Sequence, residues 1–237
     1  MTMVSPASAG EPAIGTDVYL PQEDTALLID AMDARGVRGA RVLDLCTGTG
    51  AVAIAAAAGG AREAVAVDSS HSAVEHARAA ACAAGRPVTV RHADLAAEHG
   101  RFEVVTCNPP YVPTPTLSHP AFHPAGPAHA WDAGVDGRAV LDPLCRHAPT
   151  LLTPGGTLLV VQSEFAGVDA SIVALEGAGL AAQVIAERWI PFGPVLTARA
   201  RWLEHRGLLE HGRRIERLVV IAARAPDTTA QARGRHR

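Results

Sequence analysis

Short apolar runs alternate with longer amphipathic stretches along most of the chain, starting near residue 41. The short runs are rich in valine and leucine, which predicts buried strands, and they lie at 41–45, 63–68, 88–92, 102–106, 157–162, 181–189 and 217–222. The longer stretches predict helices, which lie at 52–58, 72–84, 138–152 and 168–178. An insertion at 190–212 separates the last two runs and carries a further predicted helix near 195–206. Repeated strand–helix units predict an α/β fold with a doubly wound, mostly parallel sheet.

The length and composition fit one domain with short appendages. The chain has 237 residues, of which 48% are hydrophobic, so it can build a sizeable core. We expect a flexible N-terminus at 1–16, a globular domain at 17–224 and a disordered tail at 225–237. No apolar run is long enough to span a membrane, and the first residues lack a signal-peptide pattern, so we expect a cytoplasmic location. The net charge of −3 gives no broad positive field for nucleic acid, which makes that partner unfavourable.

The tetrapeptide Asn108-Pro109-Pro110-Tyr111 is the most informative chemical motif. It directly follows the strand-like run at 102–106, and its prolines stop that strand. The Asn side chain and the aromatic ring therefore stand at the C-terminal end of a strand, where open α/β sheets bind ligands. The Asn108 oxygen and the Pro109 carbonyl can both accept hydrogen bonds from a planar –NH2 group, and the Tyr111 ring can pack on its face. The motif predicts a site that holds an amide or aromatic amine for a transfer reaction.

A glycine-rich turn follows the first predicted strand and opens the first helix. It contains Asp44, Cys46, Gly48 and Gly50. Small residues let the backbone approach a ligand closely, but the third glycine of a dinucleotide-binding turn is absent. The acid would also repel a pyrophosphate. The turn therefore predicts a site for a ligand that carries a cationic amino group.

Three carboxylates stand at the ends of successive predicted strands. Asp44 suits an ammonium group, and Asp68 can accept both hydroxyls of a ribose. Asp94 can accept from an adenine amino group while Leu95 covers the ring. Each acid alone also fits a turn or a helix cap. Together they match S-adenosylmethionine.

No metal site and no covalent nucleophile are predicted. The cysteines are widely spaced without a C-x-x-C pair, which indicates reduced core residues; they are Cys46, Cys82, Cys107 and Cys145. Cys107 adjoins the Asn-Pro-Pro-Tyr motif, but no base is placed by the sequence to activate it. The loop at 112–137 carries His119, His123 and His129 without a helix or hairpin to fix a ligand geometry. We expect this loop to act as a substrate lid.

These motifs resemble the HemK-type class I S-adenosylmethionine-dependent methyltransferases, the family of the release-factor glutamine N5-methyltransferases. The resemblance covers residues 17–222 and is nearest to a short branch with eukaryotic and archaeal members. The stretch VYLPQEDT at 18–25 resembles the branch pattern V-Y-x-P-x-E-D-T, and WDAGVDGR at 131–138 resembles W-x-G-G-x-x-G-R. Two departures are Cys46, where the family has a glycine, and the insertion at 190–212. A third is the helical N-terminal domain of the long bacterial enzymes, which we expect to be missing, so that substrate docking differs.

The resemblance implies a Rossmann-like, seven-stranded sheet with an antiparallel C-terminal strand, and S-adenosylmethionine as cofactor. The residues implied to hold the cofactor are Tyr19, Thr25, Asp44, Cys46, Gly48, Gly50, Asp68, Asp94, Leu95 and Asn108. The residues implied to hold a glutamine side chain of a Gly-Gly-Gln motif are Asn108, Pro109, Pro110 and Tyr111. The implied partners are a release factor as substrate and a small zinc-binding activator subunit. In the insertion, a docking surface or a packed surface helix are both open, and the residues concerned are Arg199, Arg201, Trp202 and Arg206.

Three other functions share these motifs. A small-molecule N-methyltransferase needs the same amide-holding turn and no protein-docking domain. An adenine-N6 methyltransferase of DNA or RNA also uses it, but the acidic net charge and the lack of a recognition domain count against this function. The third alternative is a non-catalytic, cofactor-binding subunit. The complete Asn-Pro-Pro-Tyr motif counts against it, because such a subunit needs no site for an acceptor.

Overall fold

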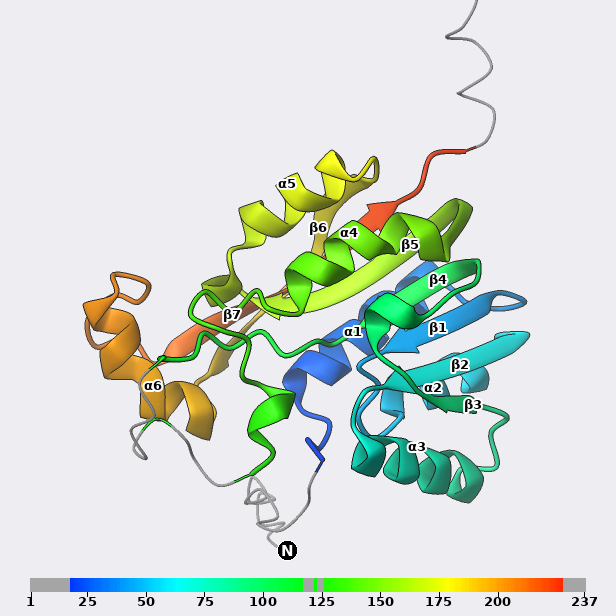
Figure 1. Cartoon of the computed structure of the whole chain (residues 1–237), viewed down its shortest axis with the longest axis horizontal. Helices are drawn as coiled ribbons and strands as arrows, with labels where there is room; N and C mark the ends of the chain where they lie inside the picture. Colours follow the sequence, from blue (N-terminus) through cyan, green and yellow to red (C-terminus); the bar gives the residue numbers. More distant parts are fainter. Residues whose placement is uncertain (1–17, 117–121, 123–125, 228–237) are drawn as a thin grey trace, which may run out of the picture.

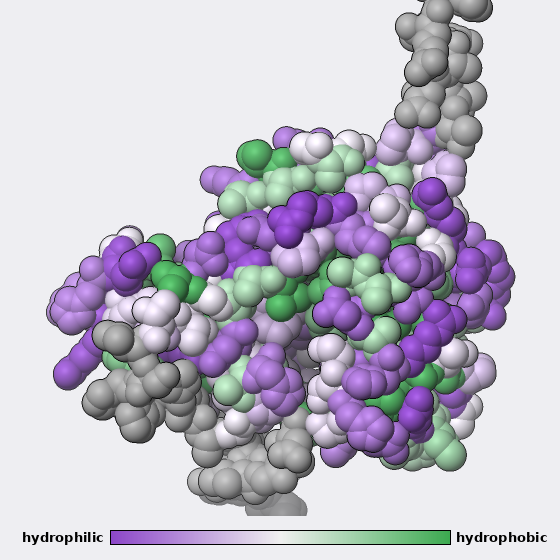
Figure 2. All heavy atoms as spheres, viewed as in Figure 1, coloured by the Kyte–Doolittle hydropathy of each residue, from purple (hydrophilic) through white to green (hydrophobic). Residues whose placement is uncertain are grey.

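The computed structural model describes residues 18–116, 122 and 126–227. The predicted flexible N-terminus at 1–16 and the tail from residue 228 onward lie outside the described residues, as do His119 and His123. Within the described ranges, no helix is long and apolar enough to cross a membrane. On the face drawn in Figure 2, hydrophilic residues are mixed with small apolar patches.

A seven-stranded sheet runs through the centre of the molecule in the order β3-β2-β1-β4-β5-β7-β6 (Figure 1). The strands are β1 (Arg41–Leu45), β2 (Glu63–Asp68), β3 (Thr89–His92), β4 (Phe102–Cys107), β5 (Leu152–Ser163), β6 (Ala181–Pro191) and β7 (Ile215–Arg224). The first five strands pair in parallel, whereas β7 pairs antiparallel with both β5 and β6. This confirms the predicted doubly wound, mostly parallel sheet with an antiparallel C-terminal strand.

Helices cover both faces of the sheet. They are α1 (Glu23–Arg35), α2 (Ala51–Ala58), α3 (His71–Ala83), α4 (Leu141–Leu151) and α5 (Val168–Gly177). A further helix, α6 (Pro194–His205), lies beyond the end of the sheet (Figure 1). Figure 1 shows α4 and α5 on the front face and α1 and α2 behind the sheet. Successive strand side chains point to opposite faces, so Leu43 and Leu45 of β1 pack in the core under α4 and α5, while Val42 packs with α1 and α2. Burial on both faces explains why these strands are continuous apolar runs.

The structure differs from the sequence pattern at α1 and at α4. The pattern predicts no element before residue 41, yet α1 buries an apolar stripe made of Leu27, Leu28, Ala31 and Met32. The predicted helix at 138–152 is shorter, because α4 ends at Leu151 and β5 begins at the next residue. Helix α1 overlaps the end of the VYLPQEDT stretch, so it fixes that stretch against the sheet.

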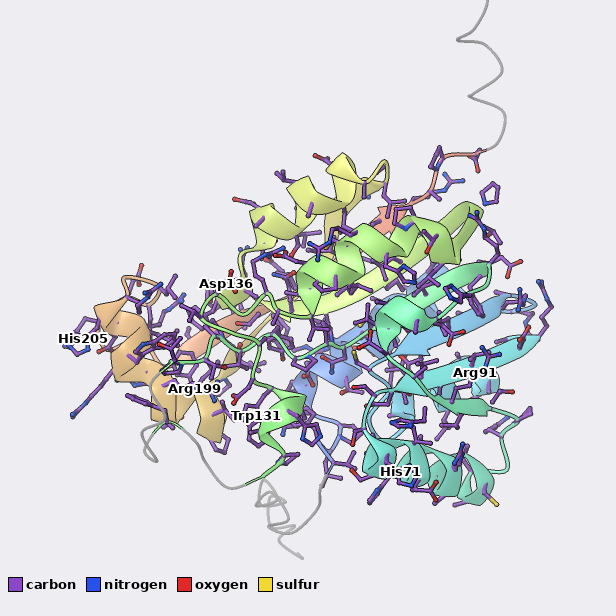
Figure 3. The ribbon with its side chains drawn as sticks, in the orientation of Figure 1. His71, Arg91, Trp131, Asp136, Arg199 and His205 are labelled. Atoms are coloured by element: carbon purple, nitrogen blue, oxygen red, sulfur yellow. The ribbon has the colours of Figure 1, made fainter. Side chains whose placement is uncertain are left out.

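The insertion at 190–212 folds as the predicted helix α6, but one of its arginines is buried. The Arg199 side chain has no exposed surface and pairs with Asp132. It also donates to the carbonyls of Pro113 and Phe122 at 3.2 and 3.1 Å and to the Thr114 hydroxyl at 3.1 Å. Figure 3 shows Arg199 on α6, facing the segment that follows β4. The prediction that Arg199 forms part of a docking surface is wrong, because it anchors the insertion to the loop.

The other residues of that predicted surface remain accessible. Arg201 and Arg206 are exposed and Trp202 is half-buried. The Arg206 guanidinium lies 6.0 Å from the centre of the Trp202 ring. Their role in docking stays a prediction.

We expect Arg199→Leu to destabilise the protein by about 3–5 kcal/mol, since it removes an ion pair and three hydrogen bonds made by a fully buried arginine. Chemical denaturation measures the loss. Arg201→Leu on the exposed side of the same helix is the matched control and should change the free energy of unfolding by less than about 0.5 kcal/mol. Equal effects of the two substitutions would contradict the anchoring role of Arg199.

Candidate active site

Two adjoining cavities of about 200 Å³ each open at the C-terminal ends of the central strands. The first cavity is lined by ten of the predicted site residues, which are Tyr19, Thr25, Asp44, Cys46, Gly48, Asp68, Asp94, Leu95, Asn108 and Pro110. The second cavity is lined by the remaining motif residues, Pro109 and Tyr111, together with Asp24, Trp131 and Glu216. Tyr19, Asn108 and Ala130 line both cavities. Among the predicted site residues, Gly50 alone lines neither.

Asp44 lies at the base of the first cavity and is almost fully buried. Its carboxylate accepts from the Thr47 hydroxyl at 2.5 Å and the Thr106 hydroxyl at 2.8 Å, and also from the Ala53 backbone. Burial raises the pKa of Asp44 to about 6, although these hydrogen bonds oppose the shift. Asp44 therefore holds the glycine-rich turn in place and gives the cavity a carboxylate that a cationic group would stabilise.

The glycine-rich turn is built from left-handed backbone. Cys46 has a φ of 54° and is the one non-glycine residue with positive φ in the described part of the chain. Such a conformation favours glycine, so the structure agrees with the family glycine that Cys46 replaces. Gly50 has a φ of 83° and caps α2, and a Cβ there would lie 3.1 Å from the Ala77 Cβ. Gly50 therefore serves close packing of α2 against α3, not the lining of the cavity.

Asp68 and Asp94 stand at the rim of the first cavity. One Asp68 oxygen accepts from the Gly48 N–H at 2.9 Å and the other from the Ser70 N–H at 2.8 Å. Asp68 thereby ties the glycine-rich turn to the end of β2, and Ser70 caps α3. Asp94 is exposed and caps a short 3-10 turn by accepting from the Ala96 N–H at 2.8 Å. A carboxylate has about four acceptor sites, so both acids keep capacity for ligand hydroxyl or amino groups.

Asn108 stands between the cavities, immediately after β4. Its Nδ2 donates to the Thr25 hydroxyl at 3.3 Å, which turns the amide nitrogen toward α1. The side-chain oxygen is then the acceptor that remains for a ligand. Thr25 is buried and its backbone N–H is held by Asp24 at 2.6 Å. The VYLPQEDT stretch thus orients the Asn-Pro-Pro-Tyr motif across a long sequence separation.

Asp24 is a site residue that the sequence pattern does not single out, although it belongs to the VYLPQEDT stretch. It accepts from the Tyr111 hydroxyl at 3.0 Å and also from the Tyr19 hydroxyl. Burial and the neighbouring Asp24 charge raise the pKa of both tyrosines. Both rings are therefore neutral donors that Asp24 fixes in place at the wall of the second cavity.

The structure gives Cys107 the environment of a core thiol. It is fully buried, and burial together with the neighbouring Cys46 raises its pKa well above the usual thiol value. A thiol that resists ionisation is a poor nucleophile. Within the described ranges, no group of three or more His, Cys, Asp or Glu is placed to hold a metal ion.

We expect Asp44→Asn to stabilise the protein at pH 8 and to leave its stability nearly unchanged at pH 4. The pKa of Asp44 is raised to about 6 in the folded protein and is about 3.9 in the unfolded state, so its ionisation opposes folding. The wild-type protein therefore loses stability as the pH rises from about 4 to about 6, and the difference between the two pKa values corresponds to about 3 kcal/mol. Chemical denaturation without ligand measures the difference. Asp33→Asn, exposed on α1, is the control, and a gain that is the same at both pH values would contradict the assignment.

Comparisons with known proteins agree with this geometry. Residues 22–123 match the family described as Methyltransferase small domain. A Methanocaldococcus jannaschii protein, provisionally named a protein N5-glutamine methyltransferase, is 32% identical over 185 residues, which cover 78% of this chain and 91% of that protein. The release factor glutamine methyltransferase of Mycolicibacterium smegmatis is 37% identical over 155 residues. These cover 62% of this chain, and the chain spans about half (54%) of the mycobacterial protein.

Solved structures give the same fold. The E. cuniculi Mtq2–Trm112 complex, responsible for methylation of the eRF1 translation termination factor, aligns with a TM-score of 0.61 and 23% identity. The alignment covers 89% of this chain and 99% of the matched chain. The archaeal relative, matched over nearly its whole length, establishes the family. The protein belongs to the HemK-type protein N5-glutamine methyltransferases, a class I family that uses S-adenosylmethionine.

Proposed function

We propose that this protein transfers a methyl group from S-adenosylmethionine to the side-chain amide of a glutamine in a peptide chain release factor. The observation that carries the proposal is the position of Asn108, which lines both cavities. An amide held by Asn108 in the second cavity faces whatever occupies the first. A release factor works where translation terminates, so the proposed place of action is the cytoplasm.

The donor set of the first cavity fits S-adenosylmethionine. Asp44 at the base suits the ammonium of its amino-acid part, and Asp68 and Asp94 at the rim suit its ribose hydroxyls and adenine amino group. Leu95 offers an apolar contact for the adenine ring. When bound, this cofactor would supply an electrophilic methyl group, whose bond to the sulfonium sulfur would break with the electron pair left on sulfur.

The residues of the second cavity would orient the acceptor nitrogen. With its nitrogen bonded to Thr25, Asn108 presents its oxygen to one N–H of the glutamine –NH2 group. The Pro109 carbonyl can accept the other N–H, and two acceptors fix the plane of the amide. Positive charge grows on the nitrogen as the new N–C bond forms, and the same two oxygens stabilise it. The nitrogen loses a proton only after transfer, so no strong base is needed beforehand.

The lining of the second cavity favours a protein acceptor over nucleic acid. It contains Glu23, Asp24 and Glu216. Glu23 is paired with Arg188. Asp24 and Glu216 are therefore the acids that leave this lining acidic, which disfavours the phosphates on which nucleic-acid binding depends. A small-molecule amine is the remaining alternative, and it is separated from a protein substrate by the labelling experiment below.

We also propose a small activator subunit as partner, in the way that Mtq2 forms a complex with Trm112. The support is the likeness in fold to Mtq2 over 89% of this chain. We attribute the zinc binding to that subunit, because the described part of this protein offers no metal site.

We expect Asn108→Ala to lower kcat by about 10²- to 10³-fold, the usual effect of removing one preorganised polar group from an active site. The affinity for S-adenosylmethionine, measured by calorimetry, should change little, because the acids of the first cavity remain. Transfer is measured with tritium-labelled cofactor and a purified release factor. Unchanged turnover with normal cofactor binding would show that Asn108 does not hold the acceptor.

The substrate class is tested by labelling a lysate with the wild-type protein and tritiated cofactor. A labelled band at release-factor size supports the proposal, and the Asn108→Ala variant should not produce it. Label confined to nucleic acid or to small molecules would overturn it in favour of one of the two other transferases. No label in any fraction would favour a non-catalytic subunit.

A further inference from the structure

Two buried side-chain atoms, on residues that line the second cavity, have no hydrogen-bond partner among the described residues. They are Oε2 of Glu216 and Nε1 of Trp131. The residues are only 6% and 8% exposed, and both line the cavity beside Asn108. Buried polar groups are almost always paired. Two such atoms, on lining residues of one cavity, are candidate contacts for a ligand that carries both a donor and an acceptor.

Glu216 supplies an acceptor. It stands near the start of β7, where its carboxyl bonds to the Ser163 hydroxyl. Burial and then the neighbouring charges of Asp24 and Glu164 raise its pKa to about 7. Asp24 already accepts a hydrogen bond from the Tyr111 hydroxyl. When Glu216 is ionised, its unpaired oxygen is an acceptor that a donor from the ligand would complete.

Trp131 supplies a donor, because an indole N–H can only donate. Its position is fixed by backbone contacts: the Val112 N–H donates to the Trp131 carbonyl at 3.0 Å. Gly126 packs against the ring so closely that a Cβ there would lie 2.6 Å from it. Figure 3 shows Trp131 on the segment that follows β4. The indole N–H is therefore held in place and is not a mobile surface group.

We infer that the second cavity binds the backbone of the acceptor protein beside the methylated side chain, with Glu216 accepting a backbone N–H and Trp131 donating to a backbone carbonyl. One donor and one acceptor in a buried slot match a peptide unit, which carries one of each. An amine alone would satisfy Glu216 and leave Trp131 unpaired. This inference rests on the proposed function, and it assigns substrate recognition to residues outside the Asn-Pro-Pro-Tyr motif.

Glu216→Gln and Trp131→Phe test the two contacts; the first keeps the side-chain shape and the second keeps an aromatic ring. For a Gly-Gly-Gln peptide, each should raise KM about tenfold with little change in kcat, since each removes one hydrogen bond of substrate binding. The affinity for S-adenosylmethionine should stay unchanged in both, which also shows that the variants fold. Glu210→Gln, at an exposed position, is the matched control.

A peptide with an ester in place of the amide next to the acceptor glutamine separates recognition from structural support. The ester lacks the N–H, so with the wild-type protein it should raise KM about tenfold. With Glu216→Gln it should add little, because the contact is already lost. Esters on either side of the glutamine identify which N–H is bound. Trp131→Phe keeps the full ester effect, which preserves the test if the Glu216 variant fails to fold.

The pH dependence gives an independent readout. With a pKa of about 7, Glu216 becomes a better acceptor as the pH rises, so the wild-type KM for the peptide should fall between about pH 6 and 8. Asp24 and Glu164 face Glu216 and are unchanged in the variant. The profile should therefore flatten specifically in Glu216→Gln.

Two results would overturn the inference, and they differ. Normal transfer with wild-type KM in both variants, and an ester effect that Glu216→Gln does not reduce, would refute the backbone contacts while leaving the proposed function intact. No transfer by the wild-type protein to either the peptide or an intact release factor would refute the proposed function and this inference with it.

Discussion

Parallel pairing of β1 with β4 sets the relation between the two halves of the site. Asp44 lies opposite Thr106 in this register, and the Thr106 hydroxyl donates to the Asp44 carboxylate at 2.8 Å. The glycine-rich turn starts where β1 ends, and Asn108 follows β4 directly. The two motifs are far apart in the sequence but leave the sheet side by side. A change in strand order would separate the glycine-rich turn from the Asn-Pro-Pro-Tyr motif even if both sequences were kept.

The parts of this arrangement that depend on local sequence can be predicted from it. The strand that ends at two prolines, the acids at strand ends and the glycine-rich turn all follow from neighbouring residues. The left-handed backbone at Cys46 does not, because a cysteine gives no local sign of a positive φ. Strand order does not, because alternation is the same for many orders; it follows from the family resemblance. Asp24 and Glu216 enter the second cavity from α1 and β7, so their meeting depends on tertiary packing that no spacing reveals. The prediction for Arg199 is wrong for the same reason, since a helix pattern does not show which arginine meets a buried acid.

Contacts from other parts of the protein hold the segment after β4 in place. It is rich in proline and glycine, so it forms little regular structure of its own. Arg199 of α6 binds two of its carbonyls and Asp132, while Trp131 pairs through its backbone with Val112. The insertion that departs from the family pattern is thereby coupled to the wall of the second cavity. Variation in α6 can reshape the acceptor side of the site while the first cavity stays unchanged.

The two buried acids lower the stability of the folded protein when no ligand is bound. Burial raises the pKa of Asp44 to about 6 and that of Glu216 to about 7, so each carboxylate opposes folding at neutral pH. Asp44 lines the first cavity and Glu216 the second, so a ligand in one cavity relieves the loss of stability caused by one acid only. A ligand that brings a positive charge or an N–H to either acid offsets that cost and binds more tightly for it. The desolvation that lowers the stability of the ligand-free protein therefore favours a cation in the first cavity and a hydrogen-bond donor in the second. These two requirements restrict the ligands more than the shape of either cavity alone.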